Sequence, residues 1–161
     1  MYLAIFAEIN NNMPFSNAKI YNLKSLISAL KIITPNDSYT KIMSEINFGF
    51  KEIEHLCFWD NDNYSKISIE KDELYELVLI CWEKEQQSPI HKHNLTEAWT
   101  YILKGELTEK IYVGTEKNPP LENTIILTQK DISSIKKESK KVHRLINSYN
   151  GRSVSLHLYK K

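Results

Sequence analysis

The first third of the chain places its apolar residues at the spacing of helices. A first helix is predicted after Asn22, ending before the turn at Thr34-Pro35. Its apolar positions are Leu23, Leu26, Ile27, Leu30 and Ile33. A second helix is predicted to begin at Ser38 or Thr40, either of which can cap it, and to continue past Gly49. Its apolar positions are Ile42, Met43, Ile46, Phe50, Ile53, Leu56 and Cys57.

From Trp59 onward the pattern changes to short apolar runs and alternation, which are typical of strands. Strands are predicted over residues 64–69, 77–82, 97–104, 107–113, 124–127, 142–146 and 153–159. A glycine turn follows the third of them at Gly105, and Asn150-Gly151 is a tight-turn signal between the last two. The polar segment 129–141 is assigned to no strand. Many short, closely spaced strands favour a β-barrel or double-sheet jelly roll.

Composition supports one soluble globular domain. The chain has 161 residues, of which 42% are hydrophobic and 25% charged, so one sizeable core is expected. The expected domain spans 1–161, with a helical segment over about 1–58 and a mainly β barrel over about 59–161.

The net charge of +1 favours neither a nucleic acid nor a membrane surface as a partner. No apolar run reaches the length of a membrane span, and the first residues lack the pattern of a signal peptide. The two cysteines, Cys57 and Cys81, are expected as buried free thiols. We therefore expect a monomer located in the cytoplasm.

Two histidines separated by one residue, His91 and His93, follow the strand that ends at Trp82. Residues i and i+2 of a strand face the same side, so two imidazoles point together, which is the beginning of a metal site. By itself, such a pair is about equally compatible with a metal site and with two unrelated surface histidines.

The residues after this pair resemble the two motifs of the cupin superfamily. Four residues separate His93 from Ala98 and six more separate Ala98 from Gly105, as in the first motif. His143, three residues and Asn147 match the second motif.

One branch of that superfamily matches more closely. The chain resembles cysteine dioxygenase and related thiol dioxygenases from about Tyr64 to Tyr159. The matching motifs are Cys81-Trp82, Ser88-x-Ile90-His91-x-His93, Leu103-x-Gly105-x-Leu107, His143-Arg144 and Ser155-x-His157-x-Tyr159.

This resemblance implies a ferrous ion, Fe(2+), bound by His91, His93 and His143. Ala98 stands where cupins usually carry a glutamate ligand, and where mammalian-type relatives carry a cysteine crosslinked to the active-site tyrosine. Glu97 is the alternative ligand: it faces away if Ala98 faces inward, although a one-residue bulge would reverse this. Three neutral ligands would favour an anionic thiolate.

Ser155, His157 and Tyr159 alternate along one predicted strand and therefore share a face. This geometry permits a relay in which Ser155 orients His157 and His157 hydrogen-bonds Tyr159. The alternative is a polar face of an edge strand that meets solvent. The resemblance implies the relay, with the tyrosine hydroxyl near the bound thiol and oxygen.

Tyr64-Ser65-Lys66 departs from the family pattern. Cysteine dioxygenases have an arginine, two residues after the tyrosine, that holds the substrate carboxylate. Lys66 keeps the charge but lacks the bidentate fork. Its alignment requires one deleted residue before Cys81; without the gap Ser65 aligns instead. Trp82 matches a tryptophan of the family's substrate pocket and is otherwise a core aromatic residue.

The expected function is therefore that of an iron-dependent thiol dioxygenase, which oxidises a small thiol, L-cysteine, to its sulfinate with dioxygen. Two alternatives stay open. One keeps the reaction and changes the substrate to 3-mercaptopropionate or another thiol acid. The other is a non-catalytic cupin that binds a metal or a small ligand.

Overall fold

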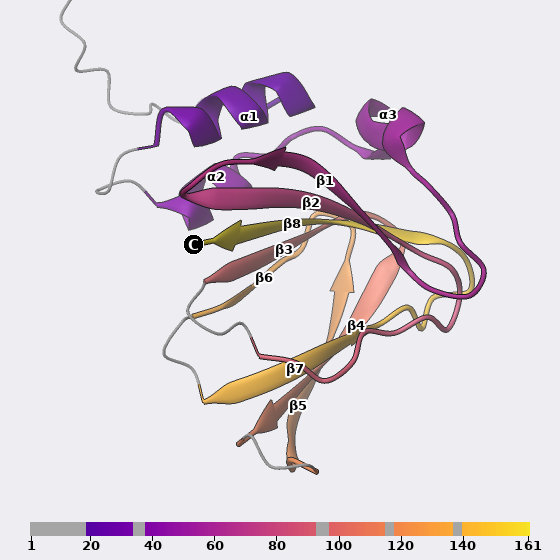
Figure 1. Ribbon diagram of the computed structural model, residues 1–161. Helices are drawn as coiled ribbons and strands as arrows, with labels where there is room; N and C mark the ends of the chain where they lie inside the picture. Colours follow the sequence, from indigo (N-terminus) through magenta and orange to yellow (C-terminus); the bar gives the residue numbers. More distant parts are fainter. Residues whose placement is uncertain (1–18, 34–37, 93–96, 115–117, 137–139) are drawn as a thin grey trace, which may run out of the picture.

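The computed structural model describes residues 19–33, 38–92, 97–114, 118–136 and 140–161 (Figure 1). Four short helices come first: α1 (Leu23–Lys31), α2 (Tyr39–Ser44), α3 (Phe50–Ile53) and the 3-10 helix η1 (Glu54–Leu56). Eight strands follow: β1 (Ser65–Lys71), β2 (Tyr75–Trp82), β3 (Ala98–Lys104), β4 (Glu106–Val113), β5 (Leu121–Thr128), β6 (Ile132–Ile135), β7 (Lys141–Ile146) and β8 (Ser153–Lys160).

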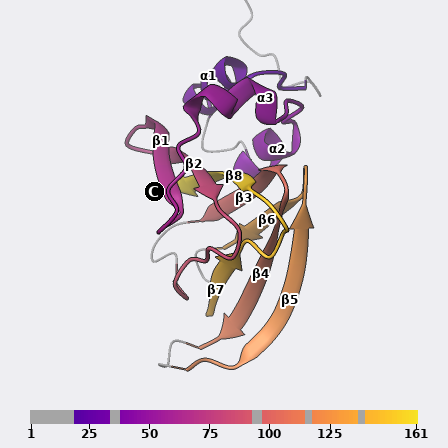
Figure 2. The same cartoon turned by 90° about the vertical axis from the view of Figure 1, so that its right-hand side faces the viewer.

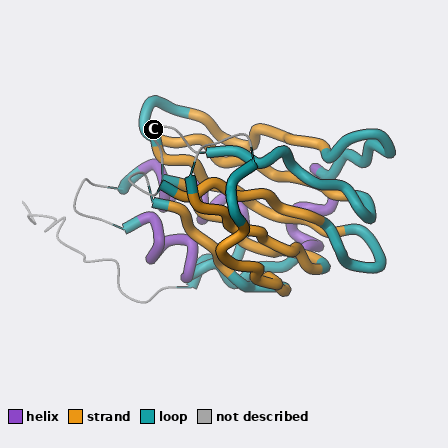
Figure 3. The backbone as a smooth tube through the Cα atoms, turned by 90° about the horizontal axis from the view of Figure 1, so that it is seen from below, coloured by secondary structure: helices purple, strands orange, loops and turns teal. Residues whose placement is uncertain are grey.

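The strands form two antiparallel sheets. One has five strands in the order β1-β2-β8-β3-β6, and the other has three in the order β5-β4-β7. The helices cover one face of the five-stranded sheet, and the three-stranded sheet lies against the other (Figures 1 and 2). Seen from below, the strands occupy the middle of the molecule and many connecting loops gather at one end (Figure 3). The described strands thus form a double-sheet jelly roll, as predicted, without hydrogen bonds that close them into one barrel.

The first helix forms as the sequence predicts. Asn22 caps α1, because its Oδ1 accepts a hydrogen bond of 2.8 Å from the backbone N–H of Ser25. Leu26 and Leu30, one turn apart, are fully buried under it against the five-stranded sheet. No helix among the described residues is long and apolar enough to cross a membrane.

The second predicted helix is wrong in its length, because α2 ends at Ser44 instead of continuing past Gly49. Ile46 forms an isolated parallel bridge with Ile20. The N–H of Ile20 donates to the carbonyl of Glu45 at 2.8 Å, and that of Asn47 donates to the carbonyl of Ile20 at 2.7 Å. These contacts between distant segments replace the helical bonds that would have continued the helix.

The polar segment assigned to no strand contains β6, which pairs with β3 from Ala98↔Ile135 to Tyr101↔Ile132. This strand is short and lies at an edge of the five-stranded sheet. Its serines carry little of the propensity that marks a strand, so the neighbouring strand, and not its own pattern, determines its conformation.

The glycine turns join the two sheets rather than the strands of one hairpin. β3 and β4 belong to different sheets, and Gly105 between them has a φ of +70°. A Cβ at this position would collide with Ser153 Oγ, so the close approach of the two segments also requires glycine. β7 and β8 likewise lie in different sheets, so the segment that contains Asn150-Gly151 connects the two sheets.

Asn147 holds the segment between β7 and β8 in place. Its side chain is fully buried, and its Nδ2 donates to the carbonyls of Trp82 at 3.2 Å, Glu83 at 3.0 Å and Gly151 at 2.8 Å. Its Oδ1 accepts from Ser153 Oγ at 2.9 Å. The asparagine of the second motif therefore ties the two sheets together at one end.

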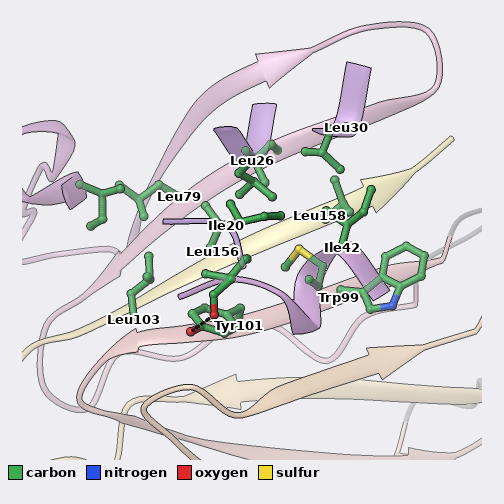
Figure 4. Close-up of a cluster of buried hydrophobic side chains, with 14 of the residues drawn as sticks. Ile20, Leu26, Leu30, Ile42, Leu79, Trp99, Tyr101, Leu103, Leu156 and Leu158 are labelled. Carbon is green, nitrogen blue, oxygen red and sulfur yellow. Dashed lines mark hydrogen bonds between the residues drawn. The ribbon is translucent and has the colours of Figure 1, made fainter. Parts of the chain in front are cut away.

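The core consists of two clusters, one on each face of the five-stranded sheet. On β2 the residues Leu77, Leu79 and Cys81 pack beneath the helices, whereas Val78, Ile80 and Trp82 pack toward the three-stranded sheet. The cluster under the helices is extensive and apolar (Figure 4). β2 is therefore buried on both faces, which explains its continuous apolar run.

Candidate functional site

A small cavity of about 40 Å³ lies on the inner face of the five-stranded sheet. Its walls come from the β1, β2 and β8 region on one side and from β7 and the segment before β3 on the other. The lining residues are Tyr64, Lys66, Ile80, Trp82, Ser88, His91, His143, Leu145, His157 and Tyr159. A space of this size holds only a few water-sized groups, so it suits a small ligand.

His91 and His143 face each other across an isolated antiparallel bridge. The backbone N–H of His91 donates to the carbonyl of His143 at 2.9 Å, and the reverse bond measures 3.0 Å. Their ring centroids are 4.6 Å apart, and both rings line the cavity. Two imidazoles that are 52 positions apart in the sequence are thus brought together by the backbone pairing.

The hydrogen bonds of these two rings determine which nitrogen can bind a metal. His91 Nδ1 lies 3.0 Å from the carbonyl oxygen of Pro89, which can only accept, so Nδ1 carries the proton. His143 Nδ1 lies 2.7 Å from Glu109 Oε1. In the neutral form of each residue, the lone pair is therefore on Nε2.

Burial, with a smaller contribution from the neighbouring His143 and Lys66, lowers the pKa of His91, although its bond to Pro89 opposes the shift. A lowered pKa keeps the imidazole neutral at pH 7, which is the form that binds a metal. Neutral imidazole nitrogens suit iron, zinc, copper and nickel, so these two residues fit a transition-metal site.

His93, the other histidine of the pair, lies outside the described residues, and its part in the site stays a prediction. Across residues 19–33, 38–92, 97–114, 118–136 and 140–161, no group of three or more His, Cys, Asp or Glu side chains gathers as a metal site. Two residues of the predicted ligand set are therefore placed together, and the third lies outside the described residues.

Glu97, the alternative ligand, lies away from the cavity. Its Oε2 is 3.8 Å from Lys160 Nζ, and it borders a separate surface pocket with Tyr39 and Trp99. Ala98 pairs with Tyr159 in the register of β3 and β8, which places its methyl group on the cavity face. Glu97 is therefore not placed to bind a metal beside His91 and His143.

Ser155, His157 and Tyr159 lie on β8, which is an interior strand of its sheet. Ser155 and His157 are buried, and Tyr159 is half-buried, so the solvent-facing alternative is excluded. Ser155 Oγ lies 2.8 Å from His157 Nε2, as expected of a residue that orients the ring. His157 and Tyr159 stack with centroids 6.0 Å apart and an angle of 21° between their planes.

Two further side chains take part in this network. Trp82 Nε1 donates to Ser155 Oγ at 2.9 Å, and because the indole nitrogen only donates, the hydroxyl hydrogen of Ser155 is available to His157 Nε2. Thr100 Oγ1 lies 3.2 Å from His157 Nδ1. Sequence reasoning missed Thr100, since its proximity depends on the register of β3 with β8, in which it pairs with His157.

Tyr159 keeps its phenol protonated at neutral pH. Burial, followed by the neighbouring Tyr64 and Glu76, raises the pKa of Tyr159 above its usual value near 10. Lys66 Nζ lies 5.7 Å from the centroid of the Tyr159 ring. The cavity thus contains a hydroxyl donor and, at its rim, a cation.

The structure places Lys66, and not Ser65, at the cavity. Lys66 pairs with Ile80, an inner-face residue that also lines the cavity. Ser65 pairs with Cys81 on the other face, and its hydroxyl donates to the carbonyl of Phe58. Of the two candidates, Lys66 is thus the one whose side chain reaches the cavity, and its pairing with a substrate carboxylate stays a prediction.

Tyr64 and Trp82 form an aromatic wall of the cavity. Their ring centroids are 4.6 Å apart, with 25° between the planes. Trp82 is only 1% exposed, so it is at once a core residue and a lining residue. The interpretation as a core aromatic residue is therefore confirmed, and its part in a substrate pocket stays a prediction.

Comparison with known families identifies the chain. Residues 18–161 match the family described as cysteine dioxygenase type I. The chain belongs to this family. The match extends over nearly the whole chain, and it confirms the resemblance that the short motifs indicated.

Solved structures support the same fold at low sequence identity. TT1209 from Thermus thermophilus is 18% identical with a TM-score of 0.56, covering 67% of this chain and 92% of that one. A protein with a double-stranded β-helix domain from Klebsiella pneumoniae is 15% identical with a TM-score of 0.55, covering 67% and 85%. A cupin superfamily protein from Desulfitobacterium hafniense is 14% identical with a TM-score of 0.52, covering 66% and 84%. These likenesses confirm the cupin fold of this family member.

Proposed function

We propose that this member of the cysteine dioxygenase type I family is an iron-dependent enzyme that oxidises a small thiol to its sulfinate. The proposed first substrate is L-cysteine. The reaction balances as one thiol plus one dioxygen giving one sulfinic acid, with both oxygen atoms in the product. The observation that carries the proposal is one cavity that contains His91 and His143, the Tyr159 phenol and the Lys66 ammonium.

His91 and His143 would hold the ferrous ion through their Nε2 atoms, with His93 as the third predicted ligand. When bound, this ion supplies the redox chemistry that combines a thiolate with dioxygen. The protein's part is to present neutral nitrogens, whose protons are held on Nδ1 by Pro89 and Glu109. Ligands without charge favour an anionic thiolate beside them.

Lys66 and the aromatic wall would select the substrate. The Lys66 ammonium would pair with a substrate carboxylate, since it lies on the inner face of β1 at the cavity rim. Tyr64 and Trp82 stack to form a flat, rigid boundary that limits the length of the thiol. The small volume of the cavity favours substrates of a few heavy atoms.

Tyr159 would donate a hydrogen bond to the reacting oxygen or sulfur atoms. Its raised pKa keeps the phenol protonated, so it can donate at neutral pH. Trp82, Ser155, His157 and Thr100 form a connected chain of hydrogen bonds behind it. This chain holds the ring of His157, against which Tyr159 stacks, and it would restrict the position of the phenol.

A thiol acid without an amino group, such as 3-mercaptopropionate, is the second candidate substrate. Among the described residues that line the cavity there is no Asp or Glu to pair with a substrate ammonium. Lys66 serves a carboxylate equally well in both compounds. The amino group of cysteine would therefore depend on the metal, whereas 3-mercaptopropionate places no such demand.

The test is anaerobic reconstitution with Fe(2+), followed by oxygen uptake and product mass measured with L-cysteine, 3-mercaptopropionate and cysteamine. The proposal expects a sulfinate that carries two atoms from isotopically labelled dioxygen, with cysteamine the poorest substrate because it lacks a carboxylate. His143→Ala is the matched control, and it should lose most of the bound iron and the product. An iron-loaded protein that oxidises none of these thiols would instead support a non-catalytic cupin.

A further inference from the structure

Glu109 is a buried carboxylate directly behind the cavity. It lies on the inner face of β4 and is 1% exposed. Its Oε1 is 2.7 Å from His143 Nδ1, and its Oε2 accepts a hydrogen bond of 2.5 Å from Ser133 Oγ. Both carboxylate oxygens are therefore engaged, one by a histidine ring and one by a hydroxyl.

The strand register explains why these groups meet. His143 on β7 pairs with Ile111 on β4, so Glu109, two residues earlier on the same face, is its diagonal neighbour. Ser133 lies on β6 in the other sheet, where it pairs with Thr100. The carboxylate thus receives one partner from each sheet, and its orientation is determined by both.

A role in packing alone does not account for an acid at this position. The inner face around it is apolar, with Leu107, Leu127 and Leu145 in the same core cluster. Burial of a carboxylate costs several kcal/mol, and an apolar side chain of similar size often stabilises a fold equally well or better. The acid is therefore better explained by what it does to His143.

We propose that Glu109 is a positioning residue for the metal site. It holds His143 as the Nδ1–H tautomer, with Nε2 directed into the cavity, and it places a negative charge behind this one ligand. Carboxylates that accept from a metal-binding histidine fix its orientation and increase its strength as a donor. The inference rests on the proposed function, because it takes His143 as a metal ligand.

The two described histidines consequently differ. His91 donates its Nδ1–H to a neutral backbone carbonyl, whereas His143 donates to a carboxylate. The charge of Glu109 makes His143 the stronger donor of the pair. It also offsets part of the positive charge that three neutral ligands leave on the ion.

The first measurement is metal affinity, determined anaerobically by competition between a chelator and the protein for Fe(2+) or Co(2+). Glu109→Gln keeps the shape but removes the charge, and we expect the affinity to fall by about 10–100-fold. Ser133→Ala, which frees Oε2, should cause a smaller loss. Glu122→Gln is the matched control: it removes a carboxylate of the same sheet that pairs at the surface with Lys141, and should leave the affinity unchanged.

The second measurement needs no metal and no activity. Nitrogen NMR of the histidine rings in the metal-free protein reports their tautomers, and the signals of His143 are assigned by their absence in His143→Ala. We expect the Nδ1–H tautomer in the wild type and in Glu109→Gln, whose amide oxygen still accepts. Glu109→Ala should shift His143 toward the Nε2–H tautomer.

The outcomes separate this inference from the proposed function. If wild type and Glu109→Gln bind metal equally well and the tautomer is unchanged in Glu109→Ala, Glu109 is not a positioning residue. If the wild type binds no Fe(2+), the proposed function fails, while the NMR result still decides whether Glu109 holds the ring. Should Glu109→Ala fail to fold, a wild-type affinity in both Glu109→Gln and Ser133→Ala overturns the inference, because neither the charge nor the fixed orientation of the carboxylate then matters.

Discussion

The two sides of β8, an interior strand of the five-stranded sheet, are both largely buried but chemically different. On β8, the outward residues Val154, Leu156 and Leu158 are all 0% exposed. On its inward side Ser155 is also 0% exposed and His157 is 3% exposed. One strand thus supplies an apolar face to the helices and a polar face to the cavity.

Along β8, apolar packing and polar contacts are therefore divided by side of the strand, not by segment of the chain. The outward face is stabilised by close packing and by the burial of apolar surface. The hydrophobic effect requires no particular bond geometry. The inward face depends on specific donors and acceptors, such as Trp82 to Ser155 and Thr100 with His157. A slip of one residue in register would exchange the two faces, so the apolar face also holds the polar one in position.

The largest effect is expected from a change in the outward face alone. Leu156→Ala removes a fully buried side chain beneath the helices and should lower the free energy of unfolding by about 2–5 kcal/mol. The metal affinity of the folded fraction should stay unchanged, because the side chain points away from the cavity. Denaturant titration and metal competition on the same preparation check both statements; a large loss of affinity in the folded protein would show that the faces are not separable.

The next effect concerns the inward face at the cavity rim. Lys66→Ala should raise KM for carboxylate-bearing thiols, because a charged contact with the substrate is removed. The expected loss of binding free energy is about 1–3 kcal/mol. Cysteamine, which has no carboxylate, should be affected little, and Lys66→Arg should match or exceed the wild type with cysteine. Steady-state kinetics with both thiols measure this, and equal losses for the two would exclude the role of Lys66.

A smaller effect is expected inside the cavity. Tyr159→Phe removes only the phenol oxygen, so the fold and iron content should stay intact while turnover and the coupling of oxygen use to sulfinate formation fall. A tenfold loss of turnover corresponds to about 1.4 kcal/mol. Because burial raises the pKa of Tyr159, its ionisation should cause no loss of activity below about pH 10. Oxygen uptake and product yield across this pH range test the role, and normal coupling in Tyr159→Phe would make the tyrosine structural.

The smallest effect is expected from a variant that removes one hydrogen bond of the inward face and keeps nearly the same side-chain volume. Thr100→Val removes the partner of His157 Nδ1 and should cost about 0.5–1.5 kcal/mol of stability. Thr108→Val, on the three-stranded sheet and away from His157, is a control of the same chemistry. Thermal unfolding of the two variants decides the matter: equal stabilities would show that the bond of Thr100 to His157 contributes nothing.

The repetitive features of this protein could be predicted from its amino-acid sequence. The period of Leu26 and Leu30 predicted α1, and the continuous apolar run ending at Trp82 predicted β2, because these patterns follow directly from burial along one element. Short motifs around His91, His143 and Tyr159 were sufficient to indicate the family. Leu107, Glu109 and Ile111 are alternate residues of one predicted strand and share a face. An acid between two apolar residues on that face could have indicated Glu109, although no motif includes it.

The tertiary structure alone decided which side chains of different strands come into contact. Pairing of β3 with β8 brings Thr100 to His157, and pairing of β4 with β7 brings Glu109 to His143. The same kind of distant contact ends α2 early through Ile20 and makes a strand of the serine-rich β6. Local propensity contains no information on a partner strand or its register, because both are selected by the burial of the whole chain.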